Sequence, residues 1–137
     1  MPAVADVERF VAMGTRIELH RFGVGEADAL AAARRAIEAV DDALTIHRPS
    51  ATTALNERLM SGRDAAIDDP VLFEALVAID EAHAATLGLF DPAADRRFAS
   101  VGWGDITFDR ATARIAAVGP VAFDFGEIGR ASCRERV

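Results

Sequence analysis

The chain has 137 residues, of which 51% are hydrophobic and 27% are charged. This composition is typical of one soluble domain that is long enough to bury a core. The formal net charge of −7 disfavours nucleic acid and anionic membranes as partners, and the single cysteine excludes a disulfide framework and a cysteine-rich metal site.

A strand and a long helix are predicted in the first third of the chain. Residues 16–22 alternate polar and apolar side chains, which predicts a half-buried strand with Ile17, Leu19 and Phe22 inward. A glycine turn follows. Apolar residues then recur at spacings of three and four, which predicts an amphipathic helix over residues 26–45.

The middle of the chain contains a clear helix start. Asp69 can cap a helix with its side chain, and Pro70 then occupies the first helical position, where its missing N–H costs nothing. We expect this second long helix to end at Gly88, which suits a helix C-terminus. A shorter helix is expected within residues 50–60.

The last third is rich in short strands. Three are predicted, over residues 106–108, 113–118 and 121–123, with turns between them. Together with the helices they predict an α+β fold, in which two main helices pack against an antiparallel sheet.

A few side chains in loops could carry chemistry. Asp91 lies just past the expected helix end, between Phe90 and Pro92, where a carboxylate can point into a cleft. The alternative is that Asp91 caps the next turn while Phe90 joins the core, and spacing alone favours this alternative. Asp124, followed closely by a glycine, could place backbone amides against a phosphate or could simply begin a turn.

Two further candidates suit a flat ligand. Met13 precedes Gly14, and this pair could offer a soft packing surface and a close backbone approach to a ring, although a core methionine beside a bend is the simpler interpretation. His47 lies in a loop, where it could stack on a ring or donate to a phosphate. No histidine pair has the spacing of a zinc site. These residues alone indicate an α+β domain that could bind a flat, phosphorylated ligand.

Taken in order, the motifs resemble those of the ApbE family, the FAD:protein FMN transferases. The resemblance covers about residues 12–126 and implies the N-terminal half of an ApbE-like fold. The motifs that carry it are Met13-Gly14-Thr15, Leu44-Thr45-Ile46-His47-Arg48-Pro49-Ser50, Leu55-Asn56, Gly88-Leu89-Phe90-Asp91-Pro92 and Asp124-Phe125-Gly126.

The resemblance implies a set of contacts with the substrate FAD. The residues that would make them are Met13, His47, Leu89, Phe90, Asp91 and Asp124. His47 stands where the family usually has a tyrosine, so stacking could survive but the phenol contact could not. No catalytic residue and no metal ligand is assigned within this chain.

The resemblance also implies a reaction and its partners. Mg²⁺ would neutralise the FAD pyrophosphate while a threonine hydroxyl of an acceptor protein attacks the FMN-side phosphorus and AMP leaves. Family members are about twice as long as this chain, and the main Mg²⁺ ligands are expected in the missing C-terminal half. We therefore expect the fragment to be inactive by itself.

The end of the chain differs in character from the rest. Residues 127–137 look like the translation of a sequencing adapter, so we expect a partial flavin transferase domain over residues 1–126 and a non-native tail over 127–137. The competing hypothesis is a small, non-catalytic α+β flavin-binding or interaction module. No signal peptide or membrane span is visible, which predicts a cytoplasmic chain as written, although the parent could be exported or membrane-associated.

Overall fold

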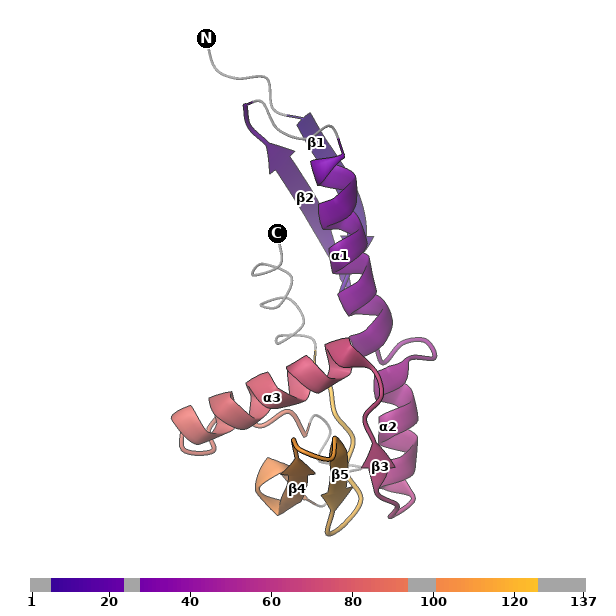
Figure 1. Ribbon diagram of the computed structural model, residues 1–137, viewed down its shortest axis with the longest axis vertical. Helices are drawn as coiled ribbons and strands as arrows, with labels where there is room; N and C mark the ends of the chain where they lie inside the picture. The colour runs from indigo at the N-terminus through magenta and orange to yellow at the C-terminus, as the bar shows by residue number, and fades with distance from the viewer. Residues whose placement is uncertain (1–5, 24–27, 94–100, 126–137) are drawn as a thin grey trace.

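The computed structural model describes residues 6–23, 28–93 and 101–125 and has an α+β architecture (Figure 1). A hairpin and a long helix form one end of an elongated molecule, and two helices with a small sheet form the other. In chain order the elements are β1 (Asp6–Ala12), β2 (Thr15–Arg21), α1 (Ala29–Leu44), α2 (Ala51–Met60), β3 (Ala65–Ala66), α3 (Pro70–Ala85), a 3₁₀ turn (Trp103–Asp105), β4 (Ile106–Asp109) and β5 (Arg114–Ala117).

Strands β1 and β2 form an antiparallel hairpin that presents one face to α1. Phe10 pairs with Ile17 across the hairpin, and both side chains pack into the core. Strand β1 was not predicted, because charged residues break its apolar pattern. One of them, Glu8, accepts a hydrogen bond of 2.8 Å from Arg34 of α1. This charged side chain therefore takes part in the contact between the hairpin and α1.

The prediction for Phe22 is wrong. Its side chain is 72% exposed and stacks on the ring of His20 at a centroid distance of 6.1 Å. Side chains alternate across a strand. Because Ile17 and Leu19 face α1, the even-numbered positions face outward, and Phe22 follows that phase just beyond the end of β2.

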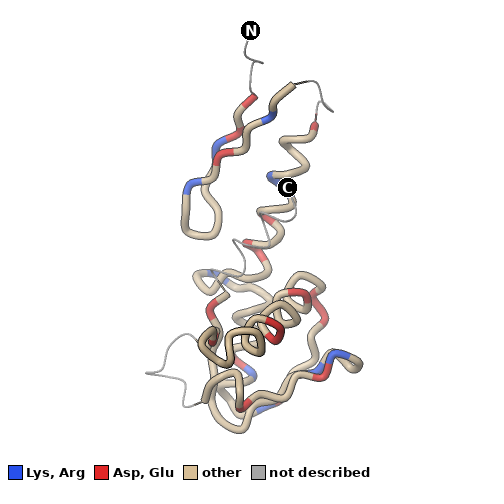
Figure 2. Tube along the Cα trace, turned by 90° about the vertical axis from the view of Figure 1, so that its left-hand side faces the viewer, with Lys and Arg blue, Asp and Glu red and all other residues tan. Residues whose placement is uncertain are grey.

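Helix α1 confirms the predicted apolar stripe. Ile37, Val40 and Leu44 are buried, and the helix contacts the hairpin on one side and helices α2 and α3 near its C-terminal end. The remaining turns expose a mixture of acidic and basic side chains. Figure 2 shows that both signs of charge also occur along the hairpin.

Two capped helices follow α1, and both were predicted. The side chain of Ser50 accepts from the Thr53 backbone N–H at 3.1 Å and so caps α2. Thr52, which is fully buried, donates to the carbonyl of Ala43 at 2.8 Å. This bond ties α2 to the end of α1. The predicted cap of α3 is also present, since Asp69 accepts from Leu72 N–H at 2.9 Å.

The described residues form two separate antiparallel sheets, where a single sheet was expected. The second sheet has the strand order β3-β5-β4. Strand β3 has only two residues, too few to produce a recognisable pattern. The strand predicted over residues 121–123 forms a single bridge, between Phe123 and Ala93, because the Phe123 backbone pairs with a side chain instead of a neighbouring strand.

An aromatic cluster forms the centre of the lower core. Phe123 lies 5.8 Å from Trp103 and 5.3 Å from Phe125, measured between ring centroids, and all three side chains are almost completely buried. None of the described helices has the length and apolar character required to cross a bilayer.

The cap of α3 gives a direct test of this fold. Asp69→Ala removes the acceptor for the Leu72 N–H, so we expect it to lower the free energy of unfolding by about 1 kcal/mol. Asp68→Ala is the matched control, because the neighbouring carboxylate is exposed and makes no cap. Chemical denaturation of both variants is the measurement, and equal losses would contradict the assigned cap.

Candidate functional site

The segment from Val121 to Phe125 is held by a side chain of α2. Asn56 donates from Nδ2 to the carbonyl of Phe123 at 3.0 Å and accepts from the Phe123 N–H at Oδ1 at 2.8 Å. One amide group therefore satisfies both backbone groups of a buried residue, as a neighbouring strand would. We call these two bonds the Asn56 clasp.

The same segment contacts residues 91–93 on its other side. Ala93 bridges Phe123, and the backbone N–H of Asp124 donates to the Pro92 carbonyl at 3.2 Å. The structure thus brings two of the predicted flavin-contacting residues, Asp91 and Asp124, into adjoining segments. Gly126, the last residue of the Asp124-Phe125-Gly126 motif, lies outside the described residues, as does the predicted tail.

Asp91 binds backbone groups of the protein itself. Its Oδ2 accepts from Trp103 N–H at 3.0 Å and its Oδ1 accepts from Ala93 N–H at 2.9 Å. Phe90 is half-buried against the core. The alternative interpretation of the sequence, in which Asp91 caps a turn and Phe90 packs inward, therefore describes the geometry of this segment.

Gly102 is required by the position of the Asp91 carboxylate. A Cβ atom built on Gly102 would overlap Asp91 Oδ2. No pattern in the sequence singled out Gly102 or Trp103. Their role depends on a contact with a carboxylate that is 12 residues away from Trp103 along the chain. The short Gly-Trp-Gly run is the local sequence feature that could have drawn attention to these positions.

Asp124 has the exposure expected of a ligand-contacting carboxylate. It is exposed, whereas its neighbours Phe123 and Phe125 are buried. Because side chains of an extended chain alternate, burial of the two phenylalanines directs the aspartate outward.

Met13 and Gly14 form the tight turn between β1 and β2. Both adopt left-handed backbone conformations, with φ of 57° and 67°. Positive φ at both central residues is what a two-residue type I′ hairpin turn requires, and it costs a non-glycine residue about 1–2 kcal/mol. The Met13 side chain is half-buried and packs against the core, so its geometry satisfies the simpler interpretation.

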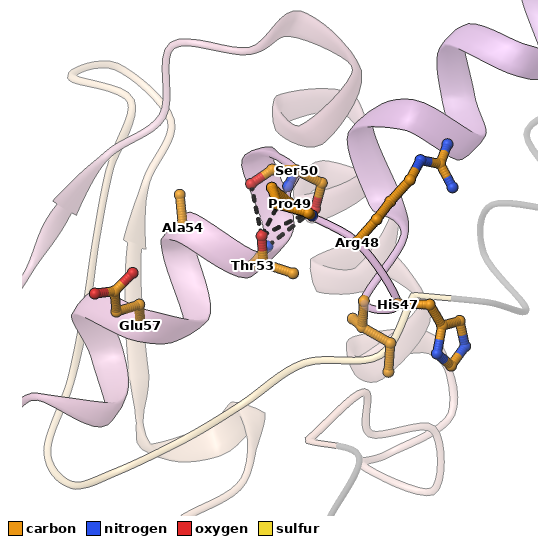
Figure 3. A pocket seen from close by; sticks show the side chains of 8 residues that line it. His47, Arg48, Pro49, Ser50, Thr53, Ala54 and Glu57 are labelled. Carbon is orange, nitrogen blue, oxygen red and sulfur yellow. Dashed lines mark hydrogen bonds between the residues drawn. The ribbon is translucent and has the colours of Figure 1, made fainter.

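His47 lines an open pocket that is formed by the loop between α1 and α2 and by the first two turns of α2 (Figure 3). The pocket has a volume of about 440 Å³, within the range of small-molecule sites. The His47 ring is exposed at its rim. The pocket is lined by Ile46, His47, Arg48, Pro49, Ser50, Thr53, Ala54 and Glu57.

Arg48, the arginine among the residues that line this pocket, already forms ion pairs with carboxylates. Arg48 forms ion pairs with Asp42 and Asp41, and the hydrogen bond that Arg48 donates to Asp42 is the main reason that the pKa of Arg48 lies above its usual value. An incoming phosphate would compete with these two carboxylates for Arg48.

Leu89 lies at an exposed turn after α3. Its side chain is 91% exposed, because Leu87 and Gly88 both adopt left-handed conformations, with φ of 53° and 83°, and turn the chain outward. A flat apolar ligand could cover this side chain. The structure therefore places Leu89, Met13 and His47 on three separate turns, while Asp91 and Asp124 lie on adjoining segments.

The described residues do not fit a Mg²⁺ site. No group of three or more His, Cys, Asp or Glu side chains within residues 6–23, 28–93 and 101–125 is arranged to hold a metal ion. Asp91 is turned toward backbone N–H groups, which suits an acceptor and not a metal ligand. The residues fit FAD better, since an imidazole, a carboxylate and a leucine of the predicted set are exposed at the surface.

Comparison with solved structures identifies the fold. An ApbE protein from Thermotoga maritima superposes with a TM-score of 0.71 and 17% identity, over 97% of this chain and 51% of that one. The chain has an ApbE-like fold. The apo form of the Pseudomonas stutzeri flavinyl transferase ApbE superposes with a TM-score of 0.69 and 16% identity, over 98% of this chain and 52% of that one.

The ApbE-like chain spans about half the length of both structures. No family model matches it, and no curated protein matches it in sequence. At 16–17% identity the likeness concerns the fold, and it confirms the α+β class and the N-terminal ApbE-like architecture that the motifs implied.

Gly102 offers a test of the Asp91 anchor. In Gly102→Ala the new methyl group displaces the carboxylate and leaves the Trp103 N–H without its acceptor, so we expect a loss of about 1–3 kcal/mol in the free energy of unfolding. Gly104→Ala is the matched control, because nothing lies within 4 Å of its Cβ position. Thermal unfolding compares the two, and equal stability of the two variants would refute the anchor.

Proposed function

We propose that this chain is the N-terminal part of an FAD:protein FMN transferase and supplies side chains that contact the flavin. The observation that carries the proposal is the ApbE-like fold over 97% of the chain. The motif segments around Asp91 and Asp124 support it, because they adjoin one another although they are far apart in sequence.

The proposed reaction moves FMN from FAD to a threonine of an acceptor protein. The threonine oxygen forms a bond to the FMN-side phosphorus, the pyrophosphate P–O bond breaks, and AMP leaves, while the hydroxyl proton passes to a base or to solvent. Mg²⁺ would offset the phosphate charge in the parent enzyme. We propose that the main Mg²⁺ ligands lie in the other half of the parent, and we assign this chain flavin binding and no step of the transfer.

The length of the two solved structures suggests which part of the proposed site this chain supplies. The chain corresponds to 51–52% of those structures, so the rest of the proposed site belongs to the other half of the parent. We also propose that residues 127–137 are not part of the parent. Genomic reads across the codons of residues 120–137 should continue in frame after Gly126 with a different sequence, whereas reads that reproduce the tail and its stop would support a small binding module.

Flavin binding can be tested on the chain as it stands. We expect titration with FAD, followed by flavin fluorescence, to give saturable binding, and His47→Ala to weaken it about fivefold, the equivalent of the ~1 kcal/mol that an aromatic contact contributes. His20→Ala is the matched control, because His20 lies on the outer face of the hairpin. No binding by the unmodified chain, or equal effects of both substitutions, would count against the proposal.

Transfer needs the complete reading frame. With FAD, Mg²⁺ and an acceptor protein that carries the target threonine, the parent should add one FMN to the acceptor, detected by mass spectrometry, and the 137-residue chain should add none. An acceptor in which that threonine is alanine is the control. FAD binding without transfer by the parent would indicate a flavin-binding relative instead.

A further inference from the structure

The Asn56 clasp does more than stabilise the core. Its two bonds fix the backbone of Phe123, the residue directly before Asp124. We infer that Asn56 is a positioning residue for the Asp124 carboxylate. This inference rests on the proposed function, in which Asp124 contacts the flavin substrate.

The clasp acts together with a second contact on the opposite side of the segment. Ala93 bridges Phe123, and the Pro92 carbonyl accepts from the Asp124 N–H at 3.2 Å. Residues 91–93 are themselves anchored, since Asp91 binds the backbone of Trp103 and Ala93. Phe123 therefore lies between two anchored elements, α2 and the 91–93 segment.

The register of residues 123–125 links the Asn56 clasp to the direction in which the Asp124 carboxylate points. Phe123 and Phe125 are each 1% exposed, and Asp124 between them is exposed. A slip of one residue in an extended segment exchanges its inward and outward faces. Such a slip would turn Asp124 into the aromatic core, so the clasp at Phe123 determines where the carboxylate lies.

Only an amide side chain meets the chemical requirement at position 56. The Phe123 carbonyl needs a donor and its N–H needs an acceptor, and the Asn56 amide provides both at once. An ionised aspartate would keep the acceptor but would set a negative charge against the carbonyl. A leucine of similar size would remove both partners and leave the two backbone groups unsatisfied.

The test compares Asn56→Leu and Asn56→Asp with Leu59→Ala in the full 137-residue chain. Leu59 is a buried residue of the same helix, so its truncation destabilises α2 packing without touching the clasp. Three quantities are measured for each variant: the unfolding midpoint, the amide hydrogen exchange of Phe123, and the dissociation constant for FAD.

We expect Asn56→Leu to accelerate exchange at Phe123 and to weaken FAD binding about tenfold, the loss that corresponds to about one or two hydrogen bonds. Asn56→Asp should weaken FAD binding while largely retaining protection of the Phe123 N–H. Leu59→Ala should lower the unfolding midpoint at least as much and leave FAD affinity within about twofold, measured where the variant is fully folded.

Two results would overturn the inference. Faster exchange in Asn56→Leu with an unchanged FAD affinity would make the clasp purely structural, and unchanged exchange at Phe123 would remove the clasp itself. If the unmodified chain binds no FAD, the proposed function fails and the positioning role fails with it. The exchange measurement separates these cases, because it reports on the clasp without any ligand.

Discussion

The pair of hydrogen bonds between Asn56 and Phe123 joins parts of the chain that are 67 residues apart. Among the described residues, the segment 121–125 forms one isolated bridge, to Ala93, and joins neither of the two sheets. Burial of Phe123 would otherwise leave an N–H and a carbonyl without partners, at a cost of about 1–3 kcal/mol each. The aromatic cluster at the base of the molecule therefore depends on one amide side chain of α2.

At Asp91, too, a side chain binds backbone groups that a neighbouring strand would otherwise pair. Its carboxylate accepts from the Trp103 and Ala93 backbones, and Gly102 leaves the space that it occupies. Trp103 then packs against Phe123 and donates from its indole to Asp80 of α3 at 3.2 Å. Asn56 and Asp91 thus hold the irregular segments around the aromatic cluster in a fixed arrangement.

Local signals in the sequence predicted the helices well. The Asp69-Pro70 start of α3 and the stripe of Ile37, Val40 and Leu44 depend only on neighbouring residues, so they were readable without tertiary information. Strand β1 was missed because charged residues that pair with α1 and β2 disturb its apolar pattern. Phe22 was misplaced because the strand pleat excludes it from the core.

The sequence predicted the motifs of the site but not how their side chains are oriented. The motifs indicated Asp91 and Asp124, and the ApbE-like fold agrees with the family that they suggested. The sequence could not distinguish a carboxylate that binds backbone from one that faces solvent. That difference depends on the contact of Asp91 with Trp103, 12 residues away, and on the contact of Phe123, the neighbour of Asp124, with Asn56, 67 residues away. No local pattern records either contact.

The most direct test of this account is a map of backbone amide NMR shifts in the ¹⁵N-labelled chain during titration with FAD. The account predicts that Met13, His47 and Asp124 shift together with one saturation curve, while Asp109, the last residue of β4, stays unchanged. Shifts confined to other parts of the molecule, or separate curves for the three residues, would contradict a common flavin site.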